Sequence, residues 1–127
     1  MANIKLPTWM FLFISMVLMT ACAQEEQGSL SGKTKNWEAM VEYRNYENAG
    51  DEKLTIRYTG GEAAFVGQVQ YKLISGQKVL SEEKTFLNGD GEIIMSSVST
   101  KPSPLAKADQ ITLEIFWNDQ KDVILLR

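Results

Sequence analysis

The sequence predicts an all-β fold, an immunoglobulin-like or fibronectin-like sandwich of about seven antiparallel strands. From Trp37 onward, apolar and polar residues alternate with a period of two, which is typical of strands that bury one face. Turn residues recur at intervals of about 8–15 positions, and no segment has the apolar spacing of an amphipathic helix. A small closed barrel is the alternative architecture.

The amino-terminal segment has the features of an export signal. One lysine, Lys5, precedes an apolar run from Trp9 to Met19. As a helix this run would extend about 17 Å at about 1.5 Å per residue, which is short of a hydrocarbon core of about 30 Å. A short apolar run behind a positive charge is typical of a cleaved signal peptide, which we place at residues 1–21.

Leu18-Met19-Thr20-Ala21-Cys22 resembles the lipobox of bacterial prolipoproteins, and Cys22 is the only cysteine in the chain. The resemblance implies cleavage between Ala21 and Cys22 and a diacylglyceryl group on the Cys22 sulfur. Two acyl chains hold a protein stably at a membrane. We therefore expect a cell-membrane protein anchored through lipid on Cys22, with its domain on the extracytoplasmic face. The alternatives are simple secretion, with cleavage near Ala21 or Ala23, and an uncleaved anchor.

Residues 22–36 are predicted to be the lipidated cysteine and a flexible linker. Leu30 is the only large apolar side chain between Ala23 and Asn36, too little to drive folding. Ala23 directly after the cysteine leaves the outer membrane open as a destination in a Gram-negative cell. The β-sandwich domain is predicted to span residues 37–127.

The predicted strands follow the alternation along this domain. Turns are expected at 75–77 and at 88–91, the latter as a hairpin, and a single helical turn at 105–108. Val79 and Leu80 break the alternation of their strand, which predicts a bulge or an edge position. The expected strands are 37–44, 54–58, 63–74, 78–87, 92–99, 110–118 and 123–126. The aromatic side chains expected to face the core are Trp37, Tyr43, Tyr58, Phe65, Tyr71 and Trp117.

We expect no enzymatic activity, no cofactor and no metal site. Histidine is absent, which removes the commonest acid–base group and a common metal ligand. Glu82 and Glu83 are neighbours in a strand and so point to opposite faces, which argues against their acting as one acid–base pair. The loop at 88–92 has oxygen ligands at alternate positions but lacks the distant bidentate glutamate of a calcium loop. A catalytic serine–lysine dyad remains an alternative, because serines and lysines are plentiful in the sequence. No spacing identifies a particular pair.

The surface chemistry gives one candidate for binding. A net charge of −3 without a basic stripe argues against nucleic acid. Phe116 falls on the polar face of its strand, beside Glu114, so a loop covers it or it forms a binding surface. With no other interaction signal in the sequence, we expect a monomer.

Four stretches carry a further resemblance: Asn36-Trp37-Glu38, Leu54-Thr55-Ile56-Arg57-Tyr58, Val69-Gln70-Tyr71-Lys72 and Ile115-Phe116-Trp117-Asn118. Through them the chain as a whole is similar to small, mostly uncharacterised lipoproteins of Gram-positive bacteria. The resemblance implies fold and location, and it carries over no catalytic residue. We expect a non-enzymatic interaction or accessory module that meets an envelope protein or polymer. The alternatives are a small envelope-acting hydrolase and a ligand-binding receptor component.

Overall fold

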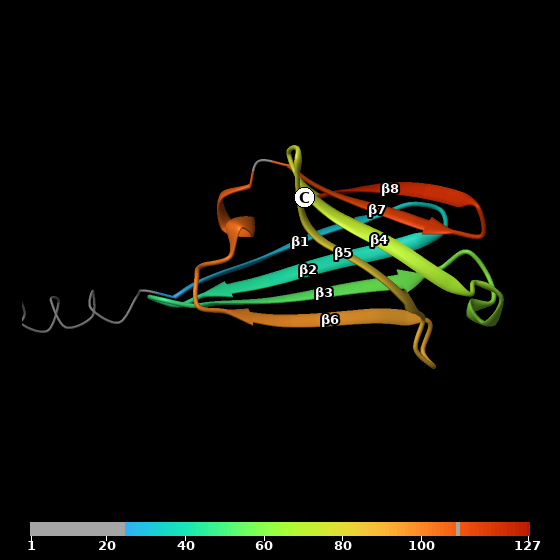
Figure 1. Cartoon of the computed structure of the whole chain (residues 1–127), viewed down its shortest axis with the longest axis horizontal. Helices are drawn as coiled ribbons and strands as arrows, with labels where there is room; N and C mark the ends of the chain where they lie inside the picture. Colours follow the sequence, from blue (N-terminus) through green and yellow to red (C-terminus); the bar gives the residue numbers. More distant parts are fainter. Residues whose placement is uncertain (1–24, 109) are drawn as a thin grey trace, which may run out of the picture.

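The structure is a computed structural model that describes residues 25–108 and 110–127. Eight strands form two four-stranded antiparallel sheets, which pack face to face (Figure 1). Sheet A has the order β1-β2-β3-β6, with β1 Glu26–Lys33, β2 Trp37–Asn45, β3 Gly50–Tyr58 and β6 Glu92–Ser99. Sheet B has the order β5-β4-β7-β8, with β4 Gln68–Ser75, β5 Lys78–Phe86, β7 Ile111–Trp117 and β8 Gln120–Leu126.

The chain changes sheets three times, between β3 and β4, between β5 and β6, and between β6 and β7. These crossovers give the sandwich its Greek-key connectivity, as in immunoglobulin-like and fibronectin-like domains. Two short 3₁₀ helices, η1 (Ala63–Phe65) and η2 (Pro104–Lys107), lie in the crossovers. The predicted fold class is confirmed, with eight strands where about seven were expected.

The core consists of the inward residues of both sheets. In β7 the alternation is strict, with Ile111, Leu113, Ile115 and Trp117 buried. Trp37 meets Trp117 edge to face across the sandwich, with ring centroids 5.3 Å apart, and Tyr58 lies 4.9 Å from Trp37 in the same way. Aromatic packing between the sheets therefore replaces a disulfide, which a chain with one cysteine cannot form internally.

The prediction of a flexible linker through residue 36 is wrong, because residues 26–33 form β1. This strand pairs with β2 along its whole length, from Glu26–Asn45 to Lys33–Glu38. Its inward positions are Gly28, Leu30 and Gly32, and glycine carries no apolar signal in a sequence. Glycine is needed at position 32, because a Cβ there would lie 2.4 Å from the Leu125 carbonyl oxygen of β8. The domain therefore begins before residue 37.

The prediction of a strand over 63–74 with Phe65 in the core is also wrong. Residues 63–65 form η1, and Gly67, at a φ of 71°, turns the chain before β4 starts at Gln68. The turn shifts the phase, so Val66 is buried and Phe65 is 78% exposed. One glycine thus moves an aromatic side chain from the expected core to the surface.

The remaining turns agree with prediction except for one. The 88–91 turn is not a hairpin, because it carries the chain from β5 in sheet B to β6 in sheet A. Gly76 turns β4 into β5, and η2 supplies the expected helical turn. β5 shows both predicted features, since it lies at the edge of sheet B and its register with β4 shifts between Leu73 and Ile74.

Candidate binding surface

Phe116 lies on the outer face of sheet B, half-buried between two lysine side chains. The Nζ of Lys72 is 5.9 Å from the ring centroid and that of Lys121 is 5.3 Å from it. Cations at these distances from an aromatic face are attracted to it. The cover of Phe116 is therefore charged side chains from β4 and β8, where a loop or open solvent was expected.

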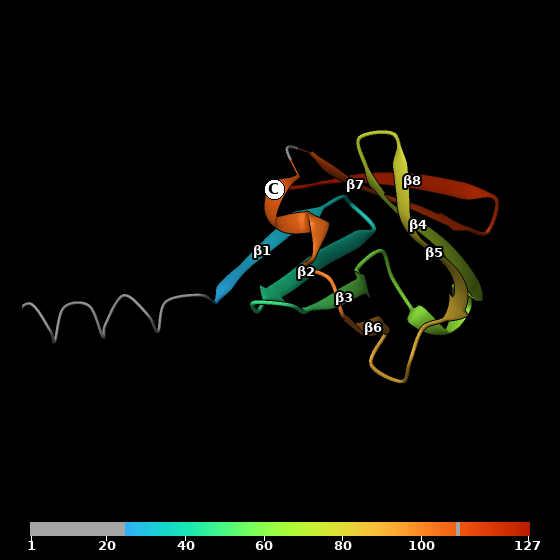
Figure 2. The same ribbon diagram turned by 60° about the vertical axis from the view of Figure 1, so that its left-hand side comes forward.

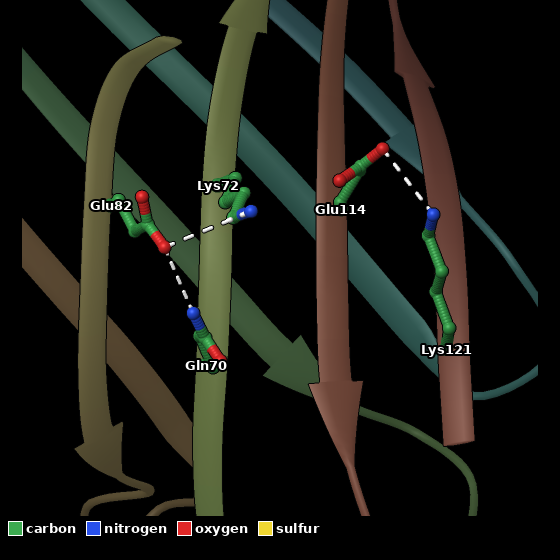
Figure 3. A network of polar contacts seen from close by, with 5 residues as sticks. All are labelled: Gln70, Lys72, Glu82, Glu114 and Lys121. Atoms are coloured by element: carbon green, nitrogen blue, oxygen red, sulfur yellow. Dashed lines mark hydrogen bonds and ion pairs between the residues drawn. The ribbon is translucent and has the colours of Figure 1, made fainter. Parts of the chain in front are cut away.

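Two glutamates accompany these lysines (Figure 3). Glu82 Oε1 accepts a hydrogen bond from Gln70 Nε2 at 2.9 Å and lies 3.8 Å from Lys72 Nζ. Glu114 Oε1 lies 3.4 Å from Lys121 Nζ. Partly exposed pairs of this kind add little stability. Their consequence here is local: the charges around Phe116 are balanced, and a partner does not need a strong opposite charge.

Two further phenylalanines, both exposed, lie at the same end of the sandwich as Phe116. Phe86, 65% exposed, is paired with Gln68, and Phe116 is paired with Gln70 two residues further along β4. Asn118, in the turn between β7 and β8, donates a hydrogen bond from Nδ2 to the Phe65 carbonyl oxygen at 3.2 Å. We call the surface formed by Phe65, Phe86 and Phe116 the aromatic end.

The aromatic end contains every phenylalanine of the described residues, while the buried aromatic side chains are Trp37, Tyr71 and Trp117. Exposed single apolar residues are ordinary, but a gathering of large ones marks a site of contact. Aromatic side chains, phenylalanine among them, are also enriched at protein interfaces. The grouping therefore indicates a binding surface more strongly than Phe116 did alone.

Beside Phe116 the surface is hollowed. The hollow has a volume of about 420 Å³ and amide side chains on its rim. These amides can both donate and accept hydrogen bonds. Its lining includes Gln68, Gln70, Lys84, Phe116, Asn118 and Gln120.

A larger hollow of about 660 Å³ lies on the outer face of sheet A. Its charged residues alternate across the strands, with Lys33 opposite Glu38, Glu38 opposite Arg57 and Arg57 opposite Glu92. Opposite charges placed across neighbouring strands favour the pairing of those strands. No exposed aromatic side chain lines this hollow, so the aromatic end is the better candidate.

The aromatic end lies opposite the start of β1. Figure 1 shows β1 beginning at one end of the sandwich, while η1, the end of β5 and the turn from β7 to β8 gather at the other. The same separation is seen in Figure 2. The chain therefore enters the described domain at the end furthest from the exposed phenylalanines.

Phe65 and Phe86 are not among the predicted binding residues, for different reasons. Phe65 was assigned to the core because Gly67 was not recognised as the end of a turn. Phe86 carried a usable signal, since it shares the alternate positions of Glu82 and Lys84, which charge places on a solvent face. Reading the phase of β5 from its charges would have placed Phe86 outside.

The polar groups elsewhere have structural roles. Ser103 is buried: it donates its hydroxyl proton to Glu52, accepts from Leu105 N at 3.2 Å, and donates from its own N–H to Asn45 Oδ1 at 2.7 Å. These bonds fasten η2 to β2 and β3. In the 88–92 loop, Asn88 Oδ1 accepts from the backbone N–H groups of Asp90 and Glu92. Within residues 25–108 and 110–127, no three acidic side chains cluster as metal ligands would.

The predicted cleavage position at Ala21–Cys22 and the predicted lipid on Cys22 lie outside the described residues. Within the described chain, no helix has the length and apolar character needed to cross a membrane. No protein-family model matches the sequence, and comparison with curated proteins and with solved structures gives no match. The fold and the surface define an all-β sandwich domain with an exposed aromatic end.

Proposed function

We propose that this protein is a lipid-anchored, extracytoplasmic module of the bacterial cell envelope, which acts by binding and not by catalysis. The observation that carries the binding role is the aromatic end, where three phenylalanines lie outside the core and one of them, Phe116, lines a hollow rimmed with amides. The lipobox-like stretch ending at Cys22 supports the anchor and the location.

The geometry of the chain supports the combination of anchor and binding surface. From Cys22 to the start of β1 at Glu26 there are four residue steps, which reach at most about 14 Å when extended. The start of β1 is therefore kept close to the membrane, and the aromatic end is the part of the domain furthest from the anchor. A partner within the envelope, either a protein or a polymer, would meet it there.

The anchor is tested with Cys22→Ser. We expect the variant to leave the tightly membrane-bound fraction and to take up no labelled fatty acid, because the thioether needs the cysteine sulfur. Ala21→Leu, which keeps the cysteine but places a bulky residue at the cleavage position, should retain lipid and slow the processing. Labelled lipid on the Cys22→Ser protein would contradict the proposal.

The binding role is tested by cross-linking in intact envelopes. In a double variant, Phe65→Ser with Phe86→Ser, the amount of cross-linked complex should fall at least tenfold. The variant should still fold, because both side chains are exposed and contribute little to the core. The matched control is Val79→Ser, an exposed apolar residue at the other end of β5. Equal cross-linking by the double variant and the control would remove the aromatic end as the binding surface.

A further inference from the structure

Three of the four outermost strands have a feature that prevents pairing with another chain. β1 and β8 lie together, where Ser31 and Arg127 exchange two backbone hydrogen bonds of 3.0 Å. β5 carries Glu82, Glu83 and Lys84 and the register shift beside Ile74. Charges, bulges and covering segments are the means by which proteins protect sheet edges.

β6 has none of these features. Its sequence is Glu-Ile-Ile-Met-Ser-Ser-Val-Ser, with one charge at the first position and no proline. Its register with β3 is regular from Arg57–Glu92 to Gly50–Ser99. Ile94 and Val98 are 47% and 81% exposed. A long, regular, uncharged edge strand is a template for adding another strand.

The direction of the backbone groups identifies the open positions. Tyr58 N donates to the Gly91 carbonyl oxygen at 3.0 Å, so residues 58 and 91 form a hydrogen-bonded pair. Since such pairs alternate along an antiparallel ladder, residues 93, 95 and 97 point their backbone groups at β3. Ile94, Ser96 and Val98 point theirs away from β3, and no strand of the described chain pairs with them.

We propose that β6 pairs antiparallel with β6 of a second copy, so that sheet A continues from one copy into the other. With Ser96 on the two-fold axis, Ile94 lies opposite Val98 of the other copy, and the same contact occurs twice. Positions 94, 96 and 98 have open backbone groups, whereas the backbone groups of Glu92 are bonded to Asn88. No like charges face each other, because Glu92 lies opposite Thr100. A register centred on Met95 would instead set Glu92 against Val98.

This pairing goes beyond the proposed function and does not depend on lipid at Cys22. It is the alternative to the expected monomer. Because the two strands run in opposite directions, the two β1 strands begin at opposite ends of the pair. If both copies are anchored in one membrane, the two-fold axis is perpendicular to that membrane and both A sheets lie along its surface.

The test is disulfide trapping of the full-length protein in its membranes. Cα atoms of a hydrogen-bonded antiparallel pair are about 5.5 Å apart, within the range of about 4.4–6.8 Å that a disulfide spans. Ser96→Cys should therefore form a covalent dimer on mild oxidation. Ile94→Cys and Val98→Cys should do so only when combined in one chain. The matched control is Val79→Cys, which is 47% exposed like Ile94 but lies on the protected edge.

Each other outcome of the trapping overturns a stated part of the proposal. If Ser96→Cys yields no more dimer than Val79→Cys, the β6 edge does not pair. A higher yield of covalent dimer from Met95→Cys than from Ser96→Cys would overturn the register centred on Ser96. A mixed disulfide between Ser96→Cys and a different protein overturns the second copy as the occupant.

A second variant separates pairing from chance collision. Ser96→Pro removes an N–H that does not point at β3, so the domain should still fold. Added to the Ile94→Cys, Val98→Cys protein, it should lower the trapped dimer at least tenfold. An undiminished yield would show that the backbone of β6 does not hold the two copies together.

Discussion

Adjacent residues in β7 have opposite roles. Trp117 is buried against Trp37, whereas Phe116 lies outside beneath two lysines. We expect Trp117→Ala to lower the free energy of unfolding by about 3–5 kcal/mol, as large aromatic truncations in cores do. Phe116→Ala should cost less than about 1 kcal/mol. Denaturant melts measure both, and equal large losses would show that both faces of the strand are buried.

The titration of the buried Tyr71 side chain is shifted by its surroundings. Its hydroxyl is buried without a hydrogen-bond partner among the described residues. Burial raises the pKa of Tyr71 above its ordinary value of 10, the negative charge of Glu83 raises it further, and the nearby Ser81 side chain opposes this rise. The unfolded chain therefore loses this proton first as the pH rises, and the folded state is destabilised above about pH 10.

Tyr71→Phe should reduce this loss of stability at high pH. At pH 7 the substitution should change the free energy of unfolding by less than about 1 kcal/mol, because the hydroxyl it removes is unpaired. Urea melts at about pH 7 and about pH 11 measure the difference. The control is Tyr46→Phe in the exposed loop between β2 and β3. If both variants keep the full alkaline loss, Tyr71 is not its source.

At the scale of the elements, β1 depends on glycine where it meets β8. A Cβ at position 32 would lie 2.4 Å from Leu125 O and 2.7 Å from a methyl carbon of Ile124. Because a backbone oxygen cannot move aside alone, Gly32→Ala should cost about 1–3 kcal/mol, as overpacking does. Gly89→Ala has no atom within 4 Å of the added carbon and should stay within about 0.5 kcal/mol. Thermal melts of the two variants compare them directly, and equal stability would place β1 further from β8.

The sequence predicted elements well where strands bury one continuous face, as in the strict alternation of β7. It failed where one glycine changes the phase, at Gly67, and where glycines occupy the inward positions of β1. It also could not separate a hairpin from a crossover at 88–91, because a local turn signal does not specify which sheet the next strand joins. For the site, Phe116 was identified from its phase, and the charges of β5 also indicate the outer position of Phe86. The outer position of Phe65 required the turn at Gly67 to be known.

For the whole molecule, β1 is the strand that joins the two sheets. It pairs with β2 in sheet A, and Ser31 bonds to Arg127, next to the end of β8 in sheet B. Thr34 adds a side-chain hydrogen bond of 2.7 Å to Asp122. One side of the sandwich is therefore held by contacts from a segment that composition alone would assign to a linker.

Truncation separates the two descriptions of this segment. A chain starting at residue 34 should be less stable than one starting at residue 25 by at least about 2 kcal/mol, at a net value of about 0.5–1.5 kcal/mol for each lost hydrogen bond. It should also aggregate more readily, because β2 becomes an open edge. Denaturant melts and light scattering of the two chains measure these effects. Equal stability would restore residues 26–33 to the role of a tether, whereas a loss of this size makes β1 part of the domain.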